Sequence, residues 1–115
     1  MATLKHLDTP SFDIAINATK TPVLVDFFAD WCGPCRALAP TLEALADDAT
    51  GNLEVVKVDI DDNPELASRF GVQKIPTLVL FDGGEAQTQI TGVVSRGELE
   101  KQIAPFLTAH RAAVN

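Results

Sequence analysis

The chain has 115 residues, of which 46% are hydrophobic and 22% are charged, and its formal net charge is −7. This length and composition predict one globular domain over residues 1–115 with a core of its own, and they argue against disorder. The acidic balance without any basic stripe argues against a nucleic-acid partner, and no apolar run approaches the roughly 18 residues of a membrane span.

The first half of the chain predicts two strands and two helices. Residues 4–7 are expected to form a short strand and residues 11–17 a short helix. The run Val23–Phe28 is almost entirely apolar, β-branched or aromatic, which predicts a strand covered on both faces. A long helix is expected after the cysteines, with an apolar face formed by Leu38, Leu42, Leu45 and Ala49. Pro40 lies inside that helix and is expected to kink it, and Gly51 ends it.

The next part of the chain predicts a strand, a short helix and another strand. Residues 53–60 form the first of these strands. Asn63 and Pro64 are an N-cap followed by proline at the first helical position, and Gly71 is a stop signal. A short helix is therefore expected between them, followed by a strand over residues 77–81.

The last part of the chain predicts a hairpin and a helix. Asp82-Gly83-Gly84 is a turn signal that leads into a strand over residues 85–91. Ser95-Arg96-Gly97-Glu98 matches a capping box, and the helix that it begins carries on one face Leu99, Ile103, Phe106 and Leu107. The polar, alanine-rich residues 108–115 are expected to fray. The order of these elements predicts an α/β fold with a central sheet and helices on its faces.

The only two cysteines, Cys32 and Cys35, lie beside the only tryptophan, Trp31. A structural zinc site needs about four ligands, and the chain adds only His6 and His110, at opposite ends. A structural disulfide that closes so short a loop would contribute roughly 2 kcal/mol. The N-terminus lacks the pattern of a signal or transit peptide, which predicts a cytoplasmic, reducing location where such a bond would not last. A reactive dithiol is the third hypothesis, and the one that these observations favour.

A dithiol at this place suits disulfide exchange. A strand that leads into C-x-x-C and then a helix puts Cys32 at the helix N-terminus, where free backbone N–H groups and the helix dipole favour a thiolate. Cys35 lies one turn further in and is expected to be less exposed. Cys32 would attack a substrate disulfide, and Cys35 would then displace the reduced substrate, which leaves a Cys32–Cys35 disulfide. Gly33 lets a substrate backbone approach, and Pro34 pre-sets the first turn.

The motif Trp31-Cys32-Gly33-Pro34-Cys35 after an apolar strand, with Ile75-Pro76-Thr77 further along the chain, closely resembles the thioredoxin family. The resemblance extends from Leu4 to about Leu107. It implies the thioredoxin fold, a central mixed β-sheet of about five strands flanked by about four helices. It also implies a protein-disulfide reductase that acts as an electron carrier. The pair between the cysteines, Gly33-Pro34, resembles the pair found at this place in the reducing branch of the superfamily.

Asp26 interrupts the apolar run Val23–Phe28. One interpretation is a strand end that faces solvent. The other is a buried carboxyl group with a raised pKa, placed to take the proton from Cys35. The resemblance favours the second interpretation, because the matching aspartate of thioredoxins accepts this proton. A lysine on the neighbouring strand, here Lys57, is its usual partner in the family.

The resemblance also implies a substrate-binding surface assembled from distant parts of the chain. The peptide bond before Pro76 is expected to be cis and to pack against the cysteines, and Ile75 is expected to present its backbone to an extended client. Gly92 and Val93 match the loop that completes this surface. The other members of the surface belong to the active-site motif: Trp31, Gly33 and Pro34.

The chain departs from the family pattern at a few positions. Phe28 stands where many members have a second tryptophan, and Arg36 replaces a common lysine. Gln73-Lys74 is not the most familiar pair before Ile75-Pro76. We expect these residues to affect packing and partner choice, and not the reaction.

The resemblance implies that a thioredoxin reductase recharges the dithiol and that disulfide-containing proteins are its clients. No cofactor is expected on the chain itself: its redox group is the reversible Cys32–Cys35 disulfide, and NADPH and FAD act only through the reductase. No metal, nucleic-acid or membrane partner is expected, and the protein is expected to be a monomer. The alternative is a redox-independent binding subunit that grips a partner with the apolar patch around Trp31.

Overall fold

A computed structural model describes residues 4–114 of the chain, with side chains up to residue 107. The strands in this part are β1 (Lys5–His6), β2 (Val23–Phe28), β3 (Glu54–Asp59), β4 (Thr77–Asp82) and β5 (Glu85–Thr91). The helices are α1 (Phe12–Ala18), α2 (Gly33–Asp48), α3 (Pro64–Arg69) and α4 (Arg96–Val114). The predicted order of strands and helices is confirmed.

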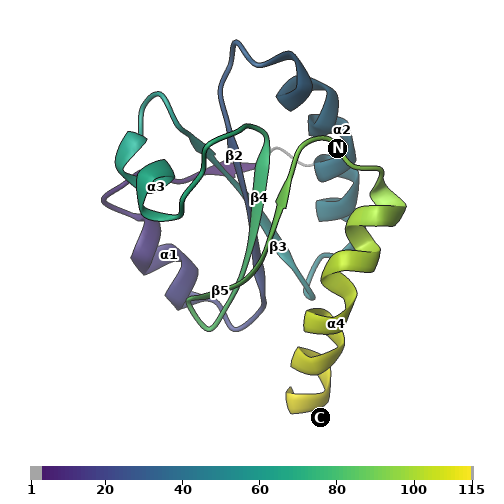
Figure 1. Cartoon of the computed structure of the whole chain (residues 1–115). Helices are drawn as coiled ribbons and strands as arrows, with labels where there is room; N and C mark the ends of the chain where they lie inside the picture. Colours follow the sequence, from purple (N-terminus) through teal and green to yellow (C-terminus); the bar gives the residue numbers. More distant parts are fainter. Residues whose placement is uncertain (1–3, 115) are drawn as a thin grey trace.

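The five strands form one mixed sheet in the order β1-β3-β2-β4-β5 (Figure 1). β1 and β2 each pair with β3 in parallel, whereas β4 is antiparallel to β2 and β5 is antiparallel to β4. β2 is therefore the central strand, and all six of its residues are buried, as expected from its apolar run. The expected α/β fold, with a central mixed sheet and helices on both faces, is confirmed.

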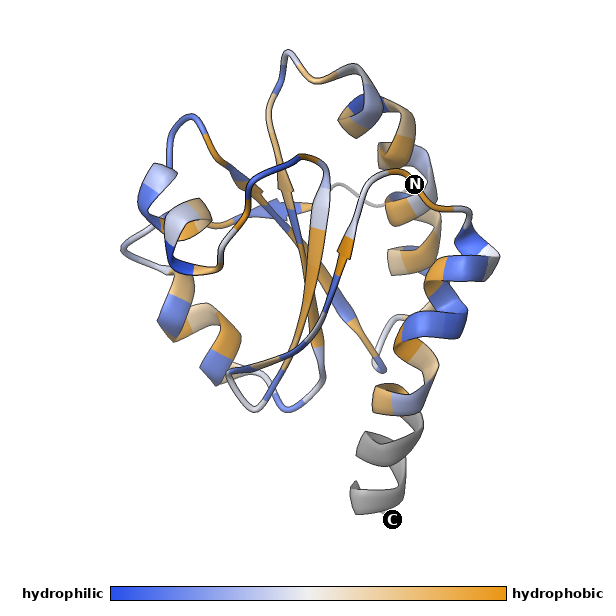
Figure 2. Ribbon diagram, viewed as in Figure 1, coloured by the Kyte–Doolittle hydropathy of each residue, from blue (hydrophilic) through white to orange (hydrophobic). Residues whose placement is uncertain are grey.

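Side chains of β2 alternate between the two faces of the sheet. Leu24 belongs to a core cluster with residues of α2 and α4, whereas Val25 belongs to a second cluster with residues of α1 and α3. The helices turn their apolar sides toward the sheet (Figure 2). Because side chains alternate, Asp26 and Phe28 share the face of Leu24, which α2 covers.

The predicted N-cap at Asn63 is correct in position, but its side chain does not cap α3. This buried side chain instead accepts a hydrogen bond from the Thr9 N–H at 2.9 Å and donates one to the Asp59 carbonyl oxygen at 3.0 Å. It therefore ties the segment after β1 to the end of β3. At α4 the predicted cap is present, because Ser95 Oγ accepts a hydrogen bond from the Glu98 N–H at 3.1 Å.

Helix α4 packs its apolar side on the core, with Leu99 and Ile103 buried as expected, and it continues to Val114. The side chains of residues 108–114 and the whole of Asn115 lie outside the described part of the chain. Fraying of this segment therefore stays a prediction, as does a single domain for the whole chain. No helix of the described residues is long and apolar enough to cross a membrane.

Ile103 and Ile14 form a matched pair for testing the packing of the core. Ile103 is buried under α4, whereas Ile14 on α1 is 75% exposed. Ile103→Ala is expected to lower the free energy of unfolding by about 2–5 kcal/mol, because it deletes buried methylene groups and leaves a cavity. Ile14→Ala is expected to change it by less than about 0.5 kcal/mol. Urea unfolding measures both values, and similar losses would contradict the packing of α4.

Candidate active site

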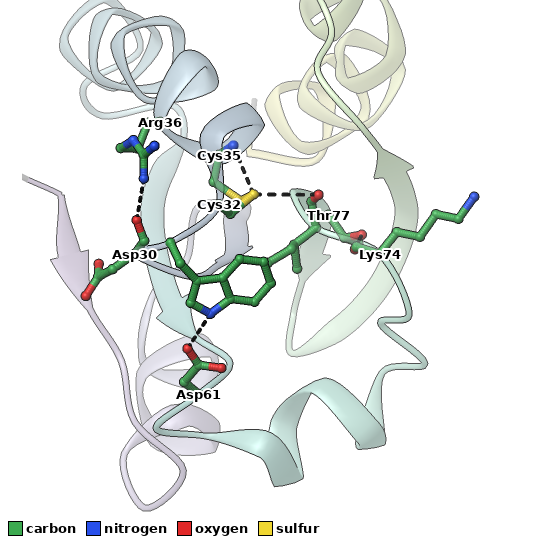
Figure 3. Close-up of a disulfide and its surroundings, with 9 residues drawn as sticks. Asp30, Cys32, Cys35, Arg36, Asp61, Lys74 and Thr77 are labelled. Carbon is green, nitrogen blue, oxygen red and sulfur yellow. Dashed lines mark hydrogen bonds between the residues drawn. A yellow bond between two sulfur atoms is a disulfide. The ribbon is translucent and has the colours of Figure 1, made fainter.

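The two cysteines lie where β2 ends and α2 begins. The hydrogen bond from the Cys32 N–H to the Ala29 carbonyl oxygen, at 3.1 Å, closes a turn, and Cys32 is the N-cap residue of α2. Cys32 and Cys35 form a disulfide, with their Cα atoms 5.2 Å apart (Figure 3). Arg36 braces the turn by donating a hydrogen bond to the Asp30 carbonyl oxygen at 2.7 Å. The expected disulfide is therefore present in its oxidised form.

The two cysteines differ in the contacts of their sulfur atoms, but as whole residues they do not differ in exposure. Each cysteine is 4% exposed, so the expectation that Cys35 is less exposed is wrong. The reason is that Ile75 packs against the pair and hides Cys32 as well. Cys32 Sγ accepts a hydrogen bond from the Cys35 N–H at 3.2 Å and lies 3.8 Å from the Ile75 carbonyl oxygen. That N–H is one of those that the start of a helix leaves unpaired, so the sulfur caps α2.

Asp26 is buried on the sheet face that α2 covers. Only 1% of the residue is exposed, and its Oδ1 atom has no hydrogen-bond partner among the described residues. The interpretation of Asp26 as a solvent-facing strand end is therefore excluded. Burial disfavours the charged form and raises the pKa of Asp26 from 3.8 to about 7. The carboxyl group can consequently gain or lose a proton near neutral pH.

Lys57 lies opposite Asp26 in the parallel pairing of β2 with β3. Its side chain is half-buried, and its Nζ atom lies 4.0 Å from the centroid of the Phe28 ring. The positive charge of Lys57 lowers the pKa of Asp26, but by less than burial raises it. Lys57 is thus an electrostatic neighbour of the buried acid, while its ammonium group contacts an aromatic ring.

One distant segment contacts the disulfide, and a second distant segment is bonded to the first. The peptide bond between Ile75 and Pro76 is cis, and Ile75 packs against the cysteine pair. Gly92, which has a φ of 92° that favours glycine, donates its N–H to the Pro76 carbonyl oxygen at 2.8 Å. The exposed Val93 follows directly in the chain. The fold therefore gathers these predicted site residues around one end of α2.

Trp31 is the large apolar side chain exposed beside the disulfide. It is 66% exposed, and its indole N–H donates a hydrogen bond to the Asp61 carboxylate at 2.7 Å (Figure 3). Gly33 and Pro34, which follow in the motif, are exposed as well. Asp61 was not among the predicted site residues, because nothing in its acidic run singles out one carboxylate. The side chain of Trp31 is thus exposed and at the same time held by a hydrogen bond.

Fold and site together define a class: an α/β protein with a redox-active cysteine pair at the N-terminus of a helix. The family model described as "Thioredoxin" matches residues 3–105. The chain belongs to the thioredoxin family.

Individual relatives agree with this membership. A thioredoxin of Alicyclobacillus acidocaldarius is 46% identical over 101 residues, which cover 88% of this chain and 95% of the relative. A thioredoxin of Streptomyces clavuligerus is 44% identical over 96 residues, which cover 84% of this chain and 89% of the relative. The chloroplastic M-type thioredoxin of Zea mays is 41% identical over 87% of this chain, and the matched region spans 60% of that relative.

As a member of this family, the chain is a thiol–disulfide oxidoreductase, and its redox-active group is the Cys32–Cys35 pair. The family works through this disulfide and not through a bound cofactor. Its partners are, in general, a reductase and proteins that carry disulfides. Within the described residues, no three His, Cys, Asp or Glu side chains gather closely enough to hold a metal ion. The alternative of a redox-independent binding subunit is not favoured, because the cysteines are placed to form a disulfide.

The raised pKa of Asp26 predicts that the stability of the oxidised protein depends on pH. Between about pH 4 and pH 7 the folded protein keeps a proton that the unfolded chain has released. The contribution of Asp26 to the free energy of unfolding therefore falls by about 1.4 kcal/mol per pH unit as the pH rises, and it levels off above about pH 7. Asp26→Asn cannot ionise, so its stability relative to wild type is expected to increase by roughly 2 kcal/mol from pH 5 to pH 8.

Urea unfolding at the two pH values measures this change. The burial of the new amide adds an offset that does not depend on pH, so the difference between the two pH values is the quantity compared. The exposed Asp62 supplies the control, since Asp62→Asn is expected to shift the free energy of unfolding by the same small amount at both. If the difference in free energy of unfolding between Asp26→Asn and wild type is the same at both pH values, the raised pKa of Asp26 is contradicted.

Proposed function

We propose that the protein reduces disulfides of other proteins, with Cys32 as the nucleophile and Cys35 as the resolving cysteine. The observation that carries this proposal is the hydrogen bond from the Cys35 N–H to Cys32 Sγ at the start of α2. In the reduced protein this donor and the helix dipole favour a Cys32 thiolate, which is the form that attacks disulfides. The positions of the two cysteines support an internal second step, because they already form a bond with each other.

The proposed reaction has two exchange steps. The Cys32 thiolate attacks one sulfur of the client disulfide, forms a mixed disulfide, and releases the other client sulfur as a thiolate. Cys35 then loses its proton and attacks Cys32 Sγ, which breaks the mixed disulfide and releases the second client sulfur. The client has gained two electrons, and the protein is left with the Cys32–Cys35 disulfide.

Asp26 is the proposed acceptor of the Cys35 proton. Its place on the α2-covered face of the sheet and its pKa of about 7 support this role, because a base is most useful when its pKa lies near the working pH. Lys57 is the proposed partner of Asp26. Its charge favours the ionised carboxylate, so it supports the proton-accepting form before the second step.

The proposed client surface surrounds the disulfide. An extended client chain would pair with the backbone of Ile75, next to the cis bond, and would bring its own disulfide to Cys32. The packing of Ile75 against the cysteines and the exposure of Trp31 support this arrangement. The full set of proposed contact residues is Trp31, Gly33, Pro34, Ile75, Pro76, Gly92 and Val93.

We further propose that a thioredoxin reductase returns the disulfide to the dithiol, with NADPH and FAD acting only there. Thioredoxins of bacteria are among the similar proteins, which supports a cytoplasmic location, although a chloroplastic protein is also among them. The protein is proposed to act as a monomer, without nucleic acid or membrane as a partner. The acidic surface charge supports a soluble monomer, since like charges disfavour association.

Substitution of each cysteine separates the two exchange steps. Wild-type protein is expected to accelerate the precipitation of insulin by dithiothreitol, and Cys32→Ser is expected to lose this acceleration entirely. Cys35→Ser keeps the attacking sulfur but cannot resolve the mixed disulfide, so mixed disulfides are expected to accumulate. Mass spectrometry detects them, and excess dithiothreitol removes them. Acceleration by Cys32→Ser, or none by the wild type, would refute the assignment.

Asp26→Asn tests the proton acceptor directly. At neutral pH it is expected to slow resolution of the mixed disulfide by at least roughly tenfold and to leave its formation nearly unchanged. Rapid-mixing fluorescence follows both steps, because Trp31 is the only tryptophan and lies beside the disulfide. Asp62→Asn serves as the control for loss of a surface charge. Equal slowing of both steps would count against Asp26 as the acceptor.

A further inference from the structure

The ammonium group of Lys57 has two possible neighbours on the face that α2 covers. Asp26 and Phe28 are two residues apart on β2, so their side chains leave the strand on the same face. Lys57 is the register partner of Asp26 on β3, so its side chain starts beside the carboxyl group. Its Nζ atom nevertheless lies over the Phe28 ring, 4.0 Å from the centroid. This is the position of a cation–π contact.

Packing alone does not explain this position. Lys57 lines a cavity of about 110 Å³, together with residues that include Phe28 and Cys35. The lysine side chain is thus not confined by close-packed neighbours on every side. The ring itself is held, because Phe28 is buried and the His6 ring packs edge-on against it, with the centroids 5.4 Å apart. A fixed aromatic face therefore competes with the carboxyl group for a side chain that has room to move.

We propose that Phe28 is a positioning residue for the proton acceptor: its ring holds the Lys57 ammonium group at a distance from the Asp26 carboxyl group. This proposal replaces the expectation from the sequence that Phe28 does not affect the reaction. The cation still acts on the acid through space, but it does not form an ion pair that would make Asp26 permanently ionised. Without the ring, the ammonium group moves to the unpaired Oδ1 atom of Asp26. The effect of this arrangement on resolution of the mixed disulfide rests on the proposed function of Asp26. The place of the Lys57 ammonium group over the Phe28 ring does not depend on that function.

Few charged groups besides Lys57 lie on this face. Asp59 is two residues beyond Lys57 on β3 and is the register partner of Phe28, and its Oδ1 atom accepts a hydrogen bond from the Asp61 N–H at 2.9 Å. On β4 the register partner of Asp26 is the apolar Leu78. The start of α2 contributes the two cysteines, which are joined in the oxidised protein, and Arg36, which is exposed and bound to the Asp30 carbonyl oxygen. Helix α4 presents apolar residues to this face. His6 of β1 lies beyond Lys57 in the sheet and contacts Phe28.

The test is the titration of the Asp26 carboxyl carbon by NMR in the oxidised protein, with the signal assigned by its loss in Asp26→Asn. Phe28→Leu removes the aromatic face but keeps an apolar side chain, and Phe28→Met is a second variant of the same kind. In both, the pKa of Asp26 is expected to fall by about one unit or more, because a cation within about 4–6 Å favours the carboxylate. Phe28→Trp keeps an aromatic face and is expected to leave the pKa within a few tenths of the wild-type value.

Water that enters around a smaller side chain would also lower the pKa, so the same substitution is made without the cation. In a Lys57→Met background, Phe28→Leu is expected to leave the pKa unchanged. A fall of equal size in that background would overturn the proposal, since solvent entry would then explain it. An unchanged pKa in both Phe28→Leu and Phe28→Met would overturn it as well.

The pH dependence of resolution gives a second readout. The inflection of the resolution rate is expected to move to lower pH in Phe28→Leu by the same shift that NMR measures. If resolution is insensitive to Asp26→Asn, Asp26 is not the proton acceptor and that part of the proposed function fails. The NMR comparison of the Phe28 variants still decides whether the ring positions Lys57, so the two failures are distinguishable.

Discussion

The removal of the Asp26 carboxyl group from water is the constraint on which the site depends. β2 lies between β3 and β4 in the sheet, and helices cover both faces (Figure 1). An ionised carboxylate there loses its hydration, and its Oδ1 atom gains no hydrogen bond in return from the described residues. The neutral acid is therefore favoured up to about pH 7. A strand at the edge of the sheet would not produce this effect, because water would reach the carboxyl group.

The register of β2 also puts this acid on the same side of the sheet as the dithiol. Alternation puts Asp26 on the face that α2 covers, and the turn at Ala29 leads the chain back over the same face. Phe28 and the two cysteines consequently share one small core cluster. A slip of one residue in β2 would turn Asp26 toward α1 and α3 and away from the sulfur atoms. The pairing of β2 with its neighbours thus determines the chemistry as well as the fold.

The elements of the fold were predictable from local signals, but several contacts of the site were not. The run Val23–Phe28 and the paired glycines at 83 and 84, both with positive φ, are signals contained within a few residues. The strand order is not local: β1 lies beside β3, and only this order brings His6 and Lys57 to Phe28. The equal burial of the cysteines likewise depends on Ile75, which comes from a distant segment. The cis bond before Pro76 was expected from the family resemblance, because no local pattern of residues distinguishes it.

A buried acid that accepts a proton must satisfy two opposing requirements. It has to be desolvated enough to remain basic near neutral pH, yet it has to be ionised when Cys35 gives up its proton. Burial alone favours the protonated form, and a close ion pair alone favours a weakly basic carboxylate. Here the charge of the lysine acts on the acid, but its ammonium group contacts an aromatic ring. The acid is then neither held in the protonated form nor locked in an ion pair. In the proposed role of Asp26 as proton acceptor, the place of Lys57 over Phe28 is what keeps the buried acid between these two limits.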